Sequence, residues 1–138
     1  MMANLSNEAV VRLYLQETWA NGNLAAVAEL AAPDISVFYP VMDQPAVGHD
    51  AVKKLISGHH AIFTVRSLAV DELIVASSQV VVRWTQRVNH IGALLNIVPS
   101  GKELSFTGIT IFRVARGLVA DERGEENFWG IARQIGAA

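Results

Sequence analysis

The stretch from Asn89 to Val119, NHIGALLNIVPSGKELSFTGITIFRVARGLV, decides the fold. It contains two turn signals, Pro99-Ser100-Gly101 and Arg116-Gly117, and the run Leu104–Val114 lies between them. In a strand, alternate residues of this run would lie on the same face. One face carries Leu104, Phe106, Gly108, Thr110, Phe112 and Val114, and the opposite face carries Ile109, Ile111 and Arg113. Because both faces carry apolar residues, we predict a strand that is covered on both sides, by the core and by a second layer or a partner chain.

Helical patterns precede this region. Ser6 begins an amphipathic pattern that stops at Asn21-Gly22-Asn23, and a second, alanine-rich pattern covers Leu24–Ala32. A third helix is predicted from His49-Asp50 to about Phe63. The other predicted elements are strands at Ile35–Tyr39, Leu68–Ala76, Gln79–His90, Leu104–Val114 and after Gly117, and a short helix or extended cover at Asn127–Ile135.

Helices followed by a run of antiparallel strands indicate the α+β class. We expect one domain over residues 1–138, a cone-shaped α+β barrel in which a curved antiparallel sheet wraps around three N-terminal helices. The open end of such a cone would give access to a cavity.

The composition narrows the function classes. Hydrophobic residues make up 51% of the 138 residues and charged residues 17%, so the apolar surplus predicts a large apolar pocket and an oligomer interface. Ile109 and Ile111 predict a homodimer through the outer face of the sheet. The net charge of −2 argues against nucleic-acid partners and anionic membranes, and without cysteine there is no disulfide or thiolate chemistry. A signal peptide and a membrane-length apolar run are not seen, which predicts a cytoplasmic protein.

The run that begins at His90, H-x-G-x(6)-P-S-G-K-x(5)-G-I-x-I-F-R-V-x-x-G-x-V, resembles the SnoaL-like polyketide cyclase family of the nuclear-transport-factor-2-like superfamily. Weaker agreement extends over almost the whole chain. The resemblance implies ring closure by intramolecular aldol condensation without metal or cofactor. In other members of the superfamily, the same kind of cavity performs isomerisation or epoxide hydrolysis.

The resemblance also implies that an acid/base carboxylate comes from the strand after the Gly117 turn. Gly124 stands where that aspartate is expected, so Asp121, Glu122 or Glu125 takes the role through a shifted register or bulge, or the cyclase reaction is not run. Asp121 is our first choice, because strict alternation gives it the same face as the apolar Val119.

A second set of candidates lies on the Gln79–His90 strand. Its more apolar face carries two polar residues, Gln86 and His90, and we predict that they face the cavity and donate hydrogen bonds to an enolate. His90 is predicted to meet Asp121, Glu122 or Arg123 there; its alternative role is to cap a loop. The predicted substrate-binding residues are Trp19, Tyr39, Phe63, Trp84, Gln86, Thr110, Phe112 and Arg123.

No His, Asp and Glu spacing in the sequence matches a known metal site. Two function classes therefore stay open. One is a cofactor-free acid/base enzyme acting on an apolar substrate, with Asp121, Glu122 and His90 as its catalytic residues. The other is a non-catalytic module that binds a small hydrophobic ligand or serves as a dimerising scaffold.

Overall fold

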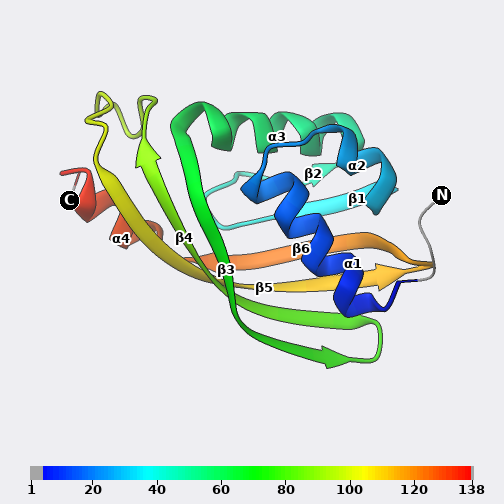
Figure 1. The fold of residues 1–138 in the computed structure, drawn as a ribbon. Coiled ribbons are helices and arrows are strands. Elements are labelled where there is room, and N and C mark those ends of the chain that lie inside the picture. Colours follow the sequence, from blue (N-terminus) through cyan, green and yellow to red (C-terminus); the bar gives the residue numbers. More distant parts are fainter. Residues whose placement is uncertain (1–4, 138) are drawn as a thin grey trace.

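The computed structural model describes residues 5–137 and has the predicted α+β architecture (Figure 1). A six-stranded, strongly curved sheet that does not close carries the helices α1–α3 on its concave side. The elements in chain order are α1 Asn7–Tyr14, a π-helix Leu15–Ala20, α2 Ala25–Leu30, β1 Ala31–Phe38, β2 Ala46–Val47, α3 His49–Ile62, β3 Phe63–Ala76, β4 Gln79–His90, β5 Glu103–Ala115, β6 Leu118–Glu126 and α4 Phe128–Gln134. No helix within residues 5–137 is long and apolar enough to cross a membrane.

The strand order is β2-β1-β6-β5-β4-β3, and β1 pairs with β6 in parallel. The sheet is therefore mixed, and the prediction of a wholly antiparallel sheet is wrong for this one pair. Strands β3 to β6 are joined by successive reversals of the chain, which impose antiparallel pairing. No reversal links β1 to β6, since most of the chain lies between them, so nothing local fixes their relative direction.

The N-terminal helices differ in detail from the predicted ones. The second helix ends at Leu30 and not at Ala32, because Pro33 disfavours helical backbone in the residue before it and strand β1 begins at Ala31. The first helix widens into a π-helix over its last turn and a half, Leu15–Ala20. This segment carries Trp19, and π-helical turns occur often at functional sites.

The turn between β5 and β6 has the conformation that its sequence predicts. Arg116 and Gly117 both have positive φ angles, 54° and 76°, as the central residues of a type I′ hairpin turn require. Just beyond the turn, the register shifts: Val114 pairs with Val119, whereas Arg113 pairs with Asp121. The pairing therefore skips Ala120, which makes a β-bulge.

This bulge reverses the alternation on β6. Val119 and Ala120 are both buried, and Glu122 then faces the interior while Asp121 lies on the opposite face, half-buried. The prediction that Asp121 faces inward in preference to Glu122 is wrong for this reason. From Glu122 onward the inward residues of β6 are Glu122, Gly124 and Glu126.

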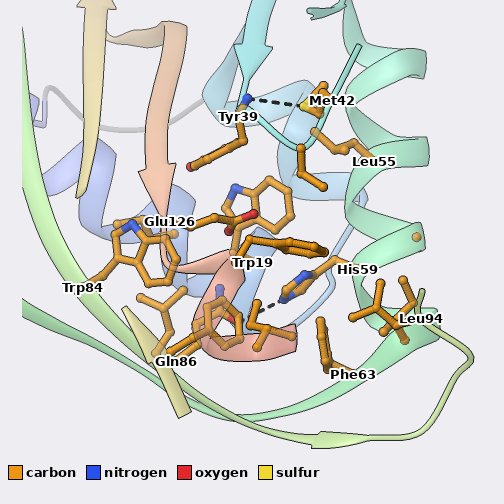
Figure 2. A pocket seen from close by; sticks show the side chains of 18 of the residues that line it. Trp19, Tyr39, Met42, Leu55, His59, Phe63, Trp84, Gln86, Leu94 and Glu126 are labelled. Carbon is orange, nitrogen blue, oxygen red and sulfur yellow. Dashed lines mark hydrogen bonds between the residues drawn. The ribbon is translucent and has the colours of Figure 1, made fainter. Parts of the chain in front are cut away.

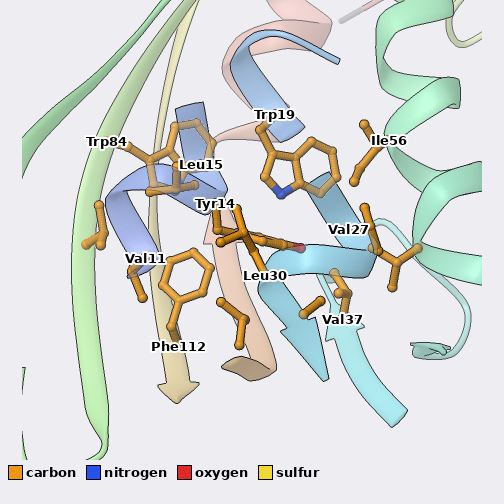
Figure 3. Packing of buried hydrophobic residues seen from close by; sticks show 14 of the residues in the cluster. Val11, Tyr14, Leu15, Trp19, Val27, Leu30, Val37, Ile56, Trp84 and Phe112 are labelled. Atoms are coloured by element: carbon orange, nitrogen blue, oxygen red, sulfur yellow. The ribbon is translucent and has the colours of Figure 1, made fainter. Parts of the chain in front are cut away.

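The hydrophobic core fills the space between the concave face of the sheet and the helices α1 and α2 (Figure 3). Tyr14 of α1 packs edge-on against Phe112 of β5, with ring centroids 6.0 Å apart. Phe112, predicted to contact a ligand, is fully buried in this cluster and lies outside the pocket lining. Strong curvature leaves the other part of the concave face unfilled, and the pocket lies there.

Candidate active site

A pocket of about 350 Å³ lies between the concave face of the sheet, the π-helix and α3 (Figure 2). Its walls are mainly aromatic and aliphatic. The aromatic lining residues are Trp19, Tyr39, Phe63, Trp84, Phe106 and Phe128, and the polar ones are Lys54, His59, Gln86 and Glu126. Of the predicted substrate-binding residues, Trp19, Tyr39, Phe63, Trp84 and Gln86 are therefore in the lining.

The aromatic rings around the pocket form a continuous series of contacts, and this series connects the helices to the sheet. His59 of α3 lies 5.4 Å from Trp19 and 5.3 Å from Phe63, measured between ring centroids. The series continues from Trp19 to Tyr39 (6.3 Å) and from Phe63 through Phe106 (5.9 Å) to Trp84 (5.7 Å). The Trp19–Tyr39, Trp19–His59 and Trp84–Phe106 pairs are edge-to-face, a favoured arrangement for aromatic rings, and the two pairs of Phe63 are tilted. They fix the shape of the cavity.

Two glycines make room for two of these rings. A methyl group on Gly124 would overlap the Tyr39 ring and lie 2.8 Å from Thr110 Oγ1, and one on Gly108 would overlap the Trp84 ring. The polar tips of both rings then meet at Thr110, with 3.0 Å from Trp84 Nε1 to Oγ1 and 3.0 Å from the Tyr39 hydroxyl to Oγ1. Thr110, predicted to bind substrate, stands behind the wall and holds the rings that form it.

We expect Gly124→Ala to destabilise the protein by about 1–3 kcal/mol, the usual cost of overpacking a filled site. Urea unfolding measures the change. Gly58→Ala is the matched control, because no atom lies within 4 Å of the added methyl group and the change removes a glycine from helix α3. This control should be neutral or gain up to about 1 kcal/mol; equal losses in both variants would contradict the tight contact at Gly124.

Glu126 is the carboxylate that opens into the pocket. It pairs with Gly108, over which the Trp84 ring lies, so its side chain emerges beside that ring on the inner face (Figure 2). Burial raises the pKa of Glu126 from 4.5 to about 7. Its carboxyl group forms no hydrogen bond or ion pair with any other residue in the described range 5–137 that would oppose this shift. Glu126 was not among the predicted site residues, although alternation from Gly124 places it on the same face of the strand.

Two further polar side chains of the pocket lining, His59 of α3 and Gln86 of β4, contact each other. His59 Nε2 lies 2.9 Å from Gln86 Oε1, and because an amide oxygen only accepts, the His59 N–H is the donor. Burial lowers the pKa of His59 from 6.5 to about 4, against the opposing effect of the Gln86 hydrogen bond, so the imidazole is neutral at pH 7. This contact orients the Gln86 side chain and leaves its NH₂ group available to a ligand. His59 was not among the predicted site residues.

Glu122 occupies a separate, fully buried position. It accepts hydrogen bonds from the Tyr14 hydroxyl at Oε1 (2.7 Å) and from the Tyr39 hydroxyl at Oε2 (2.6 Å). Burial raises the pKa of Glu122 to about 7, although both hydrogen bonds act in the opposite direction. Glu122 is not part of the pocket lining, and Tyr39 stands between it and the cavity. A ligand in the pocket would not touch this carboxylate, contrary to the predicted catalytic role.

The predicted meeting of His90 with a β6 residue does not occur. Glu122 pairs with Phe112, and Phe112 pairs with Val80. His90 lies at the far end of the same strand, and at about 3.3 Å per residue the separation along β4 is roughly 30 Å. His90 is fully buried beside Phe63, outside the pocket lining, and neither ring nitrogen has a hydrogen-bond partner among the described residues.

Arg123 also lies elsewhere. It is exposed on the outer face of the sheet, in a groove that Ile109 and Ile111 also line. The prediction that Arg123 binds substrate in the cavity is wrong, because the bulge turns Glu122 inward and its neighbour Arg123 outward. Within residues 5–137, no group of three or more His, Asp or Glu side chains is placed to hold a metal ion.

Comparisons with known proteins agree with this fold. The sequence model described as SnoaL-like polyketide cyclase matches residues 9–135. A candidate polyketide cyclase from Acidithiobacillus ferrooxidans superposes with a TM-score of 0.88 at 18% identity, covering 100% of both chains. A candidate SnoaL-like polyketide cyclase from Jannaschia sp. CCS1 gives 0.85 at 20% identity over 99% of each chain, and TsrD from Streptomyces laurentii gives 0.80 at 24% over 100% of each. No curated protein is significantly similar in sequence.

Proposed function

Because the chain belongs to the SnoaL-like polyketide cyclase family, we propose that it is an enzyme that performs cofactor-free acid/base chemistry on an apolar carbonyl compound. In this proposal Glu126 is the base and the Gln86 NH₂ group is the hydrogen-bond donor. The observation that carries it is the position of Glu126, a carboxylate without an internal partner in the described chain, in a pocket with apolar walls.

The reaction follows from these two groups. The ionised Glu126 carboxylate removes a proton from a carbon next to a carbonyl group, and the electron pair moves onto the carbonyl oxygen. The Gln86 N–H groups donate to this oxygen and stabilise the enolate. In an aldol ring closure, the enolate carbon attacks a second carbonyl carbon of the same molecule, and the resulting alkoxide takes the proton back from Glu126. His59 holds the Gln86 amide in the orientation that donation requires.

In this proposal Glu126 supplies the carboxylate that the family resemblance would place at position 124, where this chain has a glycine. Tyr39 fills the space above Gly124, so a carboxylate cannot stand there. Two residues further along the same face, the longer glutamate side chain brings a carboxylate to the cavity beyond the Tyr39 ring. A pKa near 7 gives a base that is about half ionised at neutral pH and stronger than an ordinary carboxylate.

Exchange of carbon-bound protons tests the proposal. The two-ring ketone 2-tetralone in D₂O should exchange its α-protons faster with the protein than with buffer alone, as measured by NMR. The base must be ionised, so the protein-dependent rate should rise with pH through about 7, the pKa of Glu126, and level off above it. A rate equal to that of buffer, or one that does not change between pH 5 and 8, would contradict the proposed chemistry.

The second candidate function is a non-catalytic binding module. The glycine at position 124 favours it, since the carboxylate expected from the family resemblance is missing there. The same experiment separates the two functions: a pure binding module would take up 2-tetralone, quenching the fluorescence of the pocket residues Trp19 and Trp84, without accelerating exchange.

We also propose that the protein is a homodimer, and that it acts in the cytoplasm. Ile109 and Ile111 on the outer face of β5 are 48% and 43% exposed, and a partner chain would remove this apolar stripe from water. We expect light scattering to give the mass of a dimer, and Ile109→Lys to shift it to the mass of a monomer. Val98→Lys, which makes the same kind of change at an exposed residue in the loop after β4 and outside this groove, is the control for added charge. A monomeric wild type would contradict the proposal.

A further inference from the structure

Tyr39 separates the pocket from the buried carboxylate of Glu122. Its ring belongs to the pocket lining, and its hydroxyl group donates to Glu122 Oε2 at 2.6 Å on the far side. Glu122 is fully buried and is not part of the lining. The Tyr39 ring is therefore the whole thickness of the wall at this point.

This wall is rigid, because contacts hold the ring on the sides that do not face the pocket. Two of its ring carbons, Cδ1 and Cε1, fill the space that a Cβ on Gly124 would take. Its hydroxyl contacts Thr110 as well as Glu122, and Trp19 packs edge-on against it. Rotating the side chain into solvent would leave the Glu122 and Thr110 groups buried without this partner. Each unsatisfied buried polar group costs about 1–3 kcal/mol, so the ring does not swing aside to admit a longer ligand.

The volume of the pocket is set by this wall. About 350 Å³ is near the lower end of the range for small-molecule sites, roughly 300–1,000 Å³. Trp84, fixed over Gly108 and hydrogen-bonded to Thr110, closes the neighbouring part of the wall in the same way. A larger ligand would need the space that the Tyr39 ring occupies.

We infer that Tyr39 determines the substrate size of this site and restricts it to compounds with one or two fused rings. The inference rests on the pocket of the proposed function, but it does not depend on Glu126 acting as a base. Substitution of Tyr39 by a small residue would lengthen the cavity as far as Glu122 and Tyr14, where a ligand would meet a carboxyl group instead of an apolar wall.

Binding of 2-naphthol and of its three-ring analogue 2-hydroxyanthracene tests this inference, with Trp19 and Trp84 as fluorescent reporters. Without a size limit, the third ring would tighten binding through its extra apolar area. We expect the wild type to prefer the two-ring compound by at least about tenfold, and Tyr39→Ala to reverse the preference. Tyr39→Phe, which keeps the ring and removes the hydroxyl group, should retain the wild-type preference.

Equal or tighter binding of the three-ring compound by the wild type would overturn the inference, and so would a folded Tyr39→Ala variant that still rejects it. Should Tyr39→Ala fail to fold, Tyr39→Leu offers a smaller cavity change with the same expected direction. Circular dichroism establishes the fold of each variant. Because binding is measured and not turnover, a failed exchange experiment would leave this result intact, and size-independent binding would leave the role of Glu126 intact.

Discussion

Glu126→Gln should lower the protein-dependent rate of α-proton exchange in 2-tetralone by at least about 100-fold. General-base catalysis by a positioned side chain contributes about 10²–10⁴ to a rate, and glutamine has nearly the shape of glutamate but no basic oxygen. The variant should keep the affinity for 2-naphthol, since the apolar walls of the pocket are unchanged. NMR exchange rates and fluorescence titrations measure the two properties separately.

Glu125→Gln is the matched control for this variant. Glu125 is the neighbouring glutamate, exposed on the outer face of the same strand, so the same chemical change there should leave the exchange rate as in the wild type. Equal losses in both variants would point to a general effect of charge. An unchanged rate in Glu126→Gln would remove this residue from the mechanism.

The second large effect concerns stability. Glu122 has a pKa of about 7 in the folded protein and an ordinary value, 4.5, when the chain is unfolded. Below pH 4.5 both states hold the proton and no stability is lost. As the pH rises toward 7, the unfolded state releases its proton first, so the folded state loses stability until its own carboxyl ionises. Between pH 5 and pH 8 this loss is on the order of 3 kcal/mol.

Glu122→Gln removes this ionisation and keeps a side chain that can bond both Tyr14 and Tyr39. The variant should therefore be about as stable as the wild type at pH 5 and more stable at pH 8, as urea unfolding at the two pH values measures. Contributions from Glu126 and His59 are common to both proteins and cancel in the difference. A wild type and variant with parallel pH dependence would show that Glu122 is not titrating in this range.

Periodicity and turn chemistry were sufficient to predict the class of the fold. The apolar spacing of the helices, the alternation in Leu104–Val114 and the Arg116-Gly117 turn are local signals, and the structure contains each of them. The direction of β1 against β6 was not predictable in this way. It depends on contacts between segments at opposite ends of the chain, which no local pattern encodes.

The candidate site was predicted only in part, for a related reason. Trp19, Tyr39, Trp84 and Gln86 lie in the pocket lining as expected from apolar faces of their elements. The choice of Asp121 as the inward-facing carboxylate was wrong because of the bulge at Ala120, since one extra residue exchanges the two faces of a strand. His59 could not be recognised, since its role depends on a hydrogen bond to Gln86 on a distant element.

The pKa of Glu126 is the most direct test of the proposed role. A ¹³C NMR titration of the glutamate carboxyl groups, with Glu126 assigned through Glu126→Gln and Glu122 through Glu122→Gln, measures it in the free protein. Burial in the apolar pocket predicts a midpoint near pH 7. A midpoint near 4.5, the ordinary value for glutamate, would show a solvated side chain and would contradict the account of this pocket as a site for proton abstraction.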